Sequence, residues 1–305
     1  MTAGPSTARP GTAPWNPTEP VIIGVPTAPF EARPVLPAFR WAPYRPDTAL
    51  DGWTAEHYVV RAASIRGAGH RFWGAPRQDE YALMHTPSGG VIAAVADGVS
   101  AAEQSHLGAT ATARYAVQLL GEGVTVAGEE IDWNLLAKKV AWQLAAQAEA
   151  LGLCGAGEDS AATAERMLAT TLVCSLVEPV DGDGMRVRAL SVGDSGLWSI
   201  DSGRYTLLVG AKQSTDSPIA SSAVSALPRI PVELTVVDRV LDPGAILLMG
   251  SDGIGDPLGD GTGSVGDTLW KALALPPSLL DFARLTDFSR ETFDDDRTLI
   301  GIWIR

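Results

Sequence analysis

The sequence predicts an α+β protein in which strands and helices pack as separate layers. Ten short apolar or alternating runs have the length and composition of strands. The helical patterns fall into two groups: two long helices between the third and fourth strands, and two short helices before the last strand. Elements grouped in this way favour layered α+β packing over a doubly wound parallel sheet, in which strands and helices would alternate.

The expected strands are rich in β-branched and aromatic residues and are bounded by turn residues. In chain order they are His57 to Ile65, Tyr81 to His85, Val91 to Ala96, Thr170 to Val177, Arg186 to Val192, Gly196 to Ile200, Arg204 to Val209, Val232 to Val237, Ala245 to Met249 and Thr298 to Ile304. The tripeptide Asp201-Ser202-Gly203 lies between two of these runs and is typical of a hairpin turn.

The long helices are recognised by their spacing of apolar residues. The first is expected from Glu103 to Leu120. The second begins after Asp132, whose side chain can cap the free N–H groups of a first helical turn. Its buried face is expected to carry Leu136, Val140, Leu144, Ala148 and Leu151. Shorter helices are expected at Val265 to Leu273 and at Pro277 to Leu285.

The N-terminal residues differ in composition from the rest of the chain. Eleven of the 21 prolines precede Asp47, and proline cannot donate the hydrogen bonds of helices or ladders. We therefore expect a disordered arm over residues 1–50 and one folded domain over residues 51–305. The arm is either a solvated tail or a docking segment for a partner, and the apolar stretch 21–25 could pack back on the domain. Its aromatic residues include Trp15, Phe30, Phe39 and Trp41.

Composition excludes several classes of protein. The chain has 305 residues, 46% of them hydrophobic and 19% charged, which fits a folded globular protein. A formal charge of -13 argues against a general binder of nucleic acid or anionic membranes, because phosphate recognition needs basic surface. Two cysteines, Cys154 and Cys174, are too few for a disulfide framework. Since no membrane-spanning or signal-peptide pattern is present, we expect a cytoplasmic protein.

Four aspartates stand where a strand meets a turn. Asp97, Asp194 and Asp252 each follow a short apolar run, and Asp295 precedes the closing strand. Each carboxylate is therefore expected at the rim of a core, where unpaired like charges repel one another. A divalent cation would relieve this repulsion. Several oxygen donors without a cysteine cluster indicate magnesium or manganese rather than zinc.

A longer series of motifs gives a resemblance to a known family. In order they are Gln78-Asp79, Asp97-Gly98-Val99, Ala169-Thr170-Thr171-Leu172, Val192-Gly193-Asp194-Ser195, Ser251-Asp252-Gly253 and Asp295-Asp296-Arg297-Thr298. This series resembles that of the metal-dependent Ser/Thr protein phosphatases of type 2C, in particular a bacterial subgroup. The resemblance implies a four-layer α-β-β-α sandwich of two antiparallel sheets flanked by helix pairs, with a binuclear metal centre at one end.

The resemblance also implies a role for each matching residue. Two Mn2+ or Mg2+ ions would be bridged by Asp97, with the Gly98 carbonyl and Asp79 on one side. Asp252 and Asp295 would bind the metal on the other side. A third, weaker ion is implied beside Asp194 and Asp252. The metal ligands implied are thus Asp79, Asp97, Gly98, Asp194, Asp252 and Asp295.

The implied activity is hydrolysis of phosphoserine and phosphothreonine monoesters in protein substrates. A hydroxide bridging the two metals would attack phosphorus, and a Ser/Thr kinase would oppose the enzyme in signal transduction. His106, soon after Asp97, is a candidate proton donor. The alternative is a catalytically weak or silent domain that binds a phosphoprotein or another partner. That alternative is motivated by Gln78, which replaces the family's usual glutamate.

A second departure concerns the arginine that grips substrate phosphate in the family. Its position is occupied by Gly74. Arg77, His70 and Arg71 are the candidates for its role. The segment from Ala211 to Pro231 stands where relatives carry a flap beside the active site, and its Ser, Ala and Pro content predicts mobility. Lys212 in this segment is interpreted as a surface residue in preference to a phosphate contact.

Overall fold

The computed structural model describes residues 21–28, 34, 45–123, 130–210 and 225–305. Its strands are β1 (Thr48–Thr54), β2 (Tyr58–Ile65), β3 (Glu80–His85), β4 (Val91–Ala96), β5 (Leu172–Pro179), β6 (Met185–Val192), β7 (Gly196–Asp201), β8 (Arg204–Val209), β9 (Thr235–Leu241), β10 (Ile246–Gly250) and β11 (Arg297–Ile304). They form a six-stranded sheet, β1-β2-β11-β10-β7-β8, and a five-stranded sheet, β3-β4-β5-β6-β9. Every pairing within the two sheets is antiparallel.

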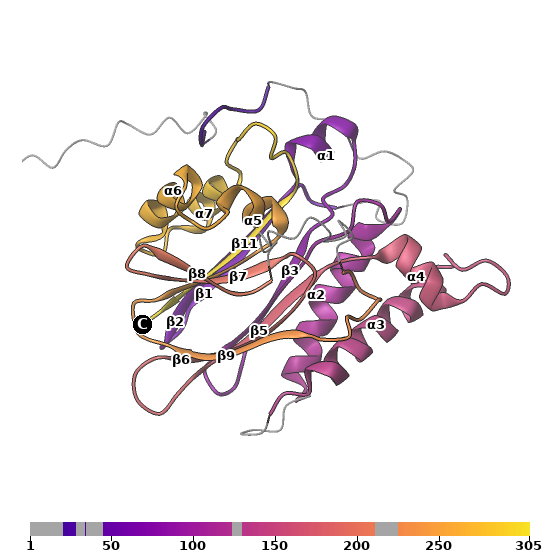
Figure 1. Ribbon diagram of the computed structural model, residues 1–305, viewed down its shortest axis with the longest axis horizontal. Coiled ribbons are helices and arrows are strands. Elements are labelled where there is room, and N and C mark those ends of the chain that lie inside the picture. Colours follow the sequence, from indigo (N-terminus) through magenta and orange to yellow (C-terminus); the bar gives the residue numbers. More distant parts are fainter. Residues whose placement is uncertain (1–20, 29–33, 35–44, 124–129, 211–224) are drawn as a thin grey trace, which may run out of the picture.

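Helices cover the outer face of each sheet (Figure 1). On the five-stranded sheet lie α2 (Ser105–Gly121), α3 (Trp133–Ala150) and α4 (Ser160–Leu168); on the six-stranded sheet lie α5 (Asp252–Leu258), α6 (Ser264–Leu273) and α7 (Leu279–Thr286). A short helix, α1 (Ala68–Trp73), lies at one end of the sandwich. The four-layer α-β-β-α arrangement is confirmed. Each outer layer has one helix more than the expected pair, because α4 lies beside α2 and α3, and α5 lies beside α6 and α7.

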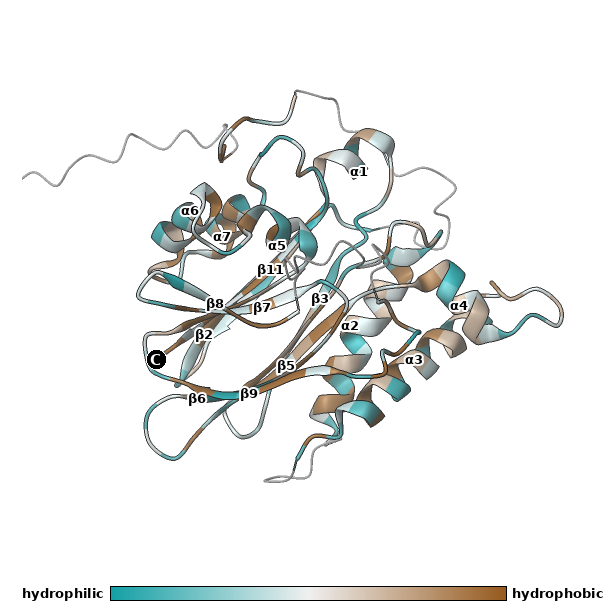
Figure 2. Ribbon diagram, in the orientation of Figure 1, coloured by the Kyte–Doolittle hydropathy of each residue, from teal (hydrophilic) through white to brown (hydrophobic). Residues whose placement is uncertain are grey.

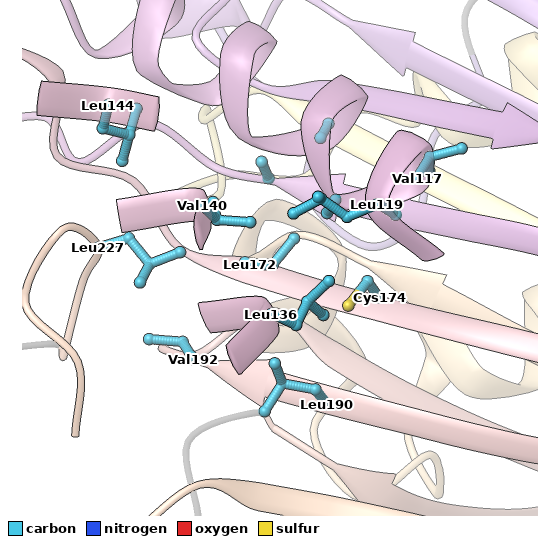
Figure 3. Close-up of a cluster of buried hydrophobic side chains, with 14 of the residues drawn as sticks. Val117, Leu119, Leu136, Val140, Leu144, Leu172, Cys174, Leu190, Val192 and Leu227 are labelled. Atoms are coloured by element: carbon cyan, nitrogen blue, oxygen red, sulfur yellow. The ribbon is translucent and has the colours of Figure 1, made fainter. Parts of the chain in front are cut away.

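Three apolar cores hold the four layers together. The middle core lies between the sheets and includes Val60, Val95, Val173 and Ile300. A second core packs α2, α3 and α4 onto the five-stranded sheet; Figure 3 shows Val140 and Leu144 of α3 with Leu172 of β5. A third core packs α6 and α7 onto the six-stranded sheet. Figure 2 agrees with this layering, because hydrophobic residues run along strands such as β5, and the helices carry both hydrophobic and hydrophilic residues.

Most predicted elements are confirmed within a few residues. The cap of α3 is also confirmed, since the Asp132 side chain accepts the Leu135 N–H at 2.8 Å. The predicted strand Val232 to Val237 is shifted, because β9 begins at Thr235 and Val232 is fully exposed. The elements not predicted are β1, α1, α4 and α5. Asp-Gly pairs at residues 51–52 and 252–253 are typical of turns, which conceals β1 and α5 in the sequence.

Part of the proline-rich segment packs on the domain. Ile23 is buried in the core beneath α6 and α7, and Ile22 forms a parallel bridge with Ser289. Thr27 Oγ1 donates a hydrogen bond to Asp294 Oδ1 at 2.7 Å. The first strand begins at Thr48, inside the range assigned to the arm. Residues 1–20, 29–33 and 35–44, which include Trp15, Phe30, Phe39 and Trp41, lie outside the described residues.

Over the ranges described above, no helix has both the length and the hydropathy needed to cross a bilayer.

Candidate active site

Four acidic residues come from the same end of the two sheets. In the five-stranded sheet, Asp79 precedes β3 and Asp97 follows its antiparallel neighbour β4. In the six-stranded sheet, Asp252 follows β10 and Asp295 lies just ahead of the neighbouring β11. Antiparallel pairing brings the start of one strand beside the end of the next. The sandwich therefore carries one pair of carboxylates from each sheet to a common end.

The backbone of Asp97 is fixed by the threonine pair at the start of β5. The Asp97 carbonyl accepts the Thr171 N–H and the Thr170 hydroxyl, both at 2.8 Å. The Asp97 N–H donates to Thr171 Oγ1 at 3.2 Å. Thr171 Oγ1 in turn lies 2.8 Å from Ser195 Oγ, beside Asp194. The Ala169-Thr170-Thr171-Leu172 motif thus orients the central aspartate and ties it to the loop between β6 and β7.

Glycines permit the close approaches that gather the acidic residues. At Gly98 a Cβ atom would lie 2.8 Å from the Ser105 side chain, so glycine is required where the chain passes the start of α2. At Gly253 a Cβ would lie 1.9 Å from the Asp296 carbonyl oxygen. At Gly67 it would lie 2.2 Å from the Asp295 carbonyl carbon. These contacts press α5 and the segment before α1 against residues 295–296.

The carboxylates are close enough to change one another's protonation. Burial, followed by the charges of Asp79, Asp252 and Asp295, raises the pKa of Asp97 well above its usual range. Contact with the Asp252 side chain raises the pKa of Asp97 further. Burial and then the charge of Asp296 raise the pKa of both Asp79 and Asp295. The cluster is therefore strained by its own negative charge.

These residues fit divalent cations. Asp79 is only 2% exposed, and within the described part of the chain its Oδ2 atom is buried without a hydrogen-bond partner. The donors are hard carboxylate oxygens, with the Gly98 carbonyl beside Asp97, and such sets suit magnesium or manganese. Cations would also neutralise the repulsion that raises the pKa of Asp97.

Asp296 forms a separate, satisfied network beside the cluster. Its carboxylate, 1% exposed, accepts the Gly67 N–H at 2.6 Å and the Gln78 N–H. His70 Nδ1 lies 2.8 Å from Asp296 Oδ1. Burial lowers the pKa of His70, but the hydrogen bond and charge of Asp296 outweigh it and raise that pKa to about 9. His70, Asp295 and Asp296 could together hold a metal ion, yet the bonds of Asp296 are those of a structural ion pair.

A cavity of about 370 Å3 opens beside the carboxylates. Its lining includes Asp252 and Asp295 together with His70, Trp73 and Phe293. Of the three candidates for phosphate binding, only His70 lines this cavity. Its Nε2 atom lies 4.0 Å from Asp295 Oδ1, too far for a hydrogen bond.

The other two candidates are engaged with protein groups. Arg77 is 2% exposed and donates to Ser64 Oγ and to the Asp79 carbonyl, so its guanidinium lies inside the protein. Arg71 pairs with Asp47 at 2.8 Å and with Asp287 at 3.2 Å. The prediction of phosphate binding therefore requires correction for Arg77, because a substrate cannot reach donors that are buried and already bonded.

His106 is also placed differently from the expectation. It is fully buried in α2, and burial followed by the charge of Arg45 lowers its pKa to about 4. A residue with this pKa is neutral at pH 7 and holds no acidic proton to donate. The structure therefore does not support His106 as a proton donor.

The structure describes Asp194, the ligand implied for a third metal, and only part of the expected flap. Asp194 is buried in the β6–β7 loop, beside Ser195, which contacts Thr171. Most of the expected flap, residues 211–224 with Lys212, lies outside the described residues. Its last part is anchored: Leu227 is buried beneath α3 and exchanges two backbone hydrogen bonds with Thr170. The expectation of mobility up to Pro231 therefore fails at Leu227.

Comparisons with known proteins agree with this architecture. Three similar solved structures are bacterial. The serine/threonine phosphatase PstP/Ppp of Mycobacterium tuberculosis is 19% identical, with a TM-score of 0.55 over 82% of this chain and 99% of that chain. The catalytic domain of PstP in complex with two manganese ions is 19% identical, with a TM-score of 0.52 over 81% and 98%. The S. agalactiae serine/threonine phosphatase is 16% identical, with a TM-score of 0.53 over 85% and 100%. At these identities the likeness shows a common fold.

No curated protein matches the sequence significantly. A family model, described as protein phosphatase 2C, matches residues 66–283. That range contains Asp79, Asp97, Asp194 and Asp252 but ends before Asp295. Because the match covers more than half of the chain, the chain belongs to the protein phosphatase 2C family.

Proposed function

We propose that this protein is a Mg2+- or Mn2+-dependent phosphatase that hydrolyses phosphoserine and phosphothreonine in proteins. The observation that carries the proposal is the grouping of Asp79, Asp97, Asp252 and Asp295, two from each sheet, in which burial and then neighbouring carboxylates raise the pKa of Asp79, Asp97 and Asp295. Carboxylates that raise one another's pKa in a cleft are typical of functional sites. Here they have the oxygen chemistry of a two-cation centre.

The protein's own residues would divide the work as follows. Asp97 would hold both cations, the Gly98 carbonyl and Asp79 would hold one, and Asp252 and Asp295 the other. Bound cations would supply positive charge for the phosphoryl oxygens and an activated water. The threonine pair would keep Asp97 oriented through its backbone. A third cation beside Asp194 and Asp252 is part of the proposal, and two ions in the related PstP catalytic domain support a centre of this kind.

His70 is the residue that we assign to substrate phosphate. Its Nδ1 side is held by Asp296, and its ring lines the cavity that Asp252 and Asp295 also line. A histidine fixed at one nitrogen can donate from the other to an anionic oxygen. His70 would thereby take the role of the family's phosphate-binding arginine, whose position is occupied here by Gly74.

The proposed substrates are phosphorylated Ser/Thr proteins in the cytoplasm, with a Ser/Thr kinase as the opposing enzyme in signal transduction. Docking of a partner through the proline-rich arm is also proposed. Its support is compositional, since proline-rich segments with aromatic residues bind readily in grooves.

The test is turnover of p-nitrophenyl phosphate and of a phosphothreonine peptide. We expect hydrolysis that requires added Mn2+ or Mg2+, that stops with EDTA, and that falls by several orders of magnitude in Asp97→Ala and Asp252→Ala. Activity that persists with EDTA or in both variants contradicts the proposal. Calorimetric titration with Mn2+ separates an enzyme from a silent partner-binding domain, since the enzyme takes up at least two ions and the silent domain binds weakly or at one site.

A further inference from the structure

Arg45 lies outside the segment matched by the family model, yet its side chain enters the interior of the domain. It precedes β1, and its side chain is only 7% exposed. Nη2 donates to the Asp79 carbonyl at 2.9 Å, Nε donates to the Arg77 carbonyl, and Nη1 donates to Thr110 Oγ1 of α2 at 2.7 Å. One guanidinium therefore joins α2 to the three-residue segment that ends in Asp79.

The segment from Arg77 to Asp79 needs such a partner. The ladder between β3 and β4 begins only at Glu80, so the carbonyls of Arg77 and Asp79 have no strand neighbour. Buried carbonyls without a partner are costly, and a planar guanidinium can serve two at once. Arg45 meets this geometry with its Nε and Nη2 atoms.

A second arginine reinforces the same point. Arg77 Nη1 donates to the Asp79 carbonyl at 2.6 Å, so this one oxygen accepts from two guanidinium groups. The buried Glu80 carboxylate lies 3.6 Å from Arg45 and 3.5 Å from Arg77. Arg45 and Arg77, both paired with Glu80, thus hold the backbone carbonyl of Asp79 in place. Truncation of one of these three side chains would leave buried charges and carbonyls unpaired.

We propose that Arg45 is a positioning residue for the metal centre. Its guanidinium holds Asp79 in place by donating to the Asp79 backbone carbonyl. This inference rests on the proposed function, because it takes Asp79 as a metal ligand. It implies that the functional unit begins ahead of residue 66, in a part of the chain whose proline content predicts disorder. Groups that orient a metal ligand typically change metal affinity by about 10- to 100-fold when removed.

The experiment compares three variants of the full chain: Arg45→Met, Arg45→Lys and the control Arg61→Met. Arg61 is also partly buried and also donates to carbonyls, those of Pro277 at 3.0 Å and Val60 at 2.8 Å, but it lies in the middle of β2. Mn2+ affinity is measured by calorimetry, and the free energy of unfolding is measured in EDTA. Both readouts are independent of catalysis.

We expect Arg45→Met to weaken the tighter Mn2+ binding by about 10- to 100-fold and to lower kcat, with a smaller change in KM. Arg45→Lys should recover part of the Mn2+ affinity, because an ammonium can donate to one of the two carbonyls but cannot bond both as the planar guanidinium does. Arg61→Met should lose stability and keep wild-type Mn2+ affinity. If Arg45→Met does not fold, the affinity of Arg45→Lys decides the question.

Wild-type Mn2+ affinity in the Arg45 variants, with stability lowered only as in Arg61→Met, overturns the inference and leaves the proposed phosphatase intact. Failure of the wild-type protein to bind Mn2+ or to hydrolyse phosphothreonine refutes the proposed function, and the inference with it. The two failures are therefore distinguished by the behaviour of the wild-type protein.

Discussion

Substitution of Gly253 by alanine should separate the geometry of the metal centre from its chemistry. Gly253 follows Asp252 in α5, and a Cβ at this position would lie 1.9 Å from the Asp296 carbonyl oxygen. Contacts under 3.0 Å require movement, so α5 and residues 295–296 must separate by at least about 1.1 Å. Backbone atoms are involved on both sides, and no side-chain rotation can relieve the clash.

The expected effect follows from the size of this displacement. Asp252 and Asp295 would hold the same cation, so a shift of this size changes the distance between two ligands of one site. A misplacement of about 1 Å can reduce a rate about 10²-fold. Overpacking also typically costs ~1–3 kcal/mol of stability. We expect Gly253→Ala to fold, to bind Mn2+ more weakly, and to lose about 10²-fold in kcat toward a phosphothreonine peptide.

Gly263→Ala is the matched control. Gly263 precedes α6, in the same outer layer, and its added Cβ meets no atom within 4 Å. Kinetics, Mn2+ calorimetry and urea unfolding in EDTA should leave this variant close to wild type. Should Gly253→Ala keep wild-type kcat and Mn2+ affinity, the close contact between α5 and Asp296 would not position the metal ligands, and the reasoning would be refuted.

Two further predictions concern protonation. His106→Gln should lower stability, because the residue is fully buried, and should leave kcat within about twofold from pH 6 to 9; a loss of kcat that is largest at low pH and shrinks as pH rises would restore its role as an acid. In the metal-free protein, the raised pKa values of Asp79 and Asp97 mean that the folded state binds more protons than the unfolded state. Stability should therefore fall as pH rises above about 4. The His70 pair with Asp296 has the same sign, since its contribution is complete below pH 6.5 and is lost through about pH 9. Thermal unfolding in EDTA measures this slope, which Asp97→Asn should flatten.

The acidic residues of the site could be predicted because each leaves a local signal. Asp97 and Asp252 interrupt apolar runs at strand ends, where a charge has no local reason to lie. Asp296 was part of a recognised motif without an assigned role, and only the structure reveals its bonds to Gly67, Gln78 and His70. His70 itself was one of three equivalent candidates. Its selection required the cavity, since sequence cannot tell which basic side chain faces solvent.

Arg45 could not be predicted from the sequence in the same way. It lies among prolines, whose density indicates disorder, and its main partners are backbone carbonyls, which carry no sequence signal. Arg77 is the opposite case, because the sequence predicts a functional role that the structure does not support. Its nearness in sequence to Asp79 suggests a substrate contact, whereas the segment that precedes β1 buries its side chain and makes its role structural. In both cases the deciding contact joins residues that are about thirty positions apart.

The candidate metal site is also a place where hydrogen bonds join the two sheets. Ser64 of β2 accepts from Thr298 of β11 at 2.7 Å and from Arg77, which leads into β3 of the other sheet. Asp296 reaches across in the same way to the Gln78 N–H. These bonds are satisfied without a cation, so they can hold the sheets in register while the carboxylates of Asp79, Asp97, Asp252 and Asp295 repel one another. A cation shared between the two pairs would turn that repulsion into a further link between the sheets, which is why metal binding should stabilise the whole sandwich and not only the loops that carry its ligands.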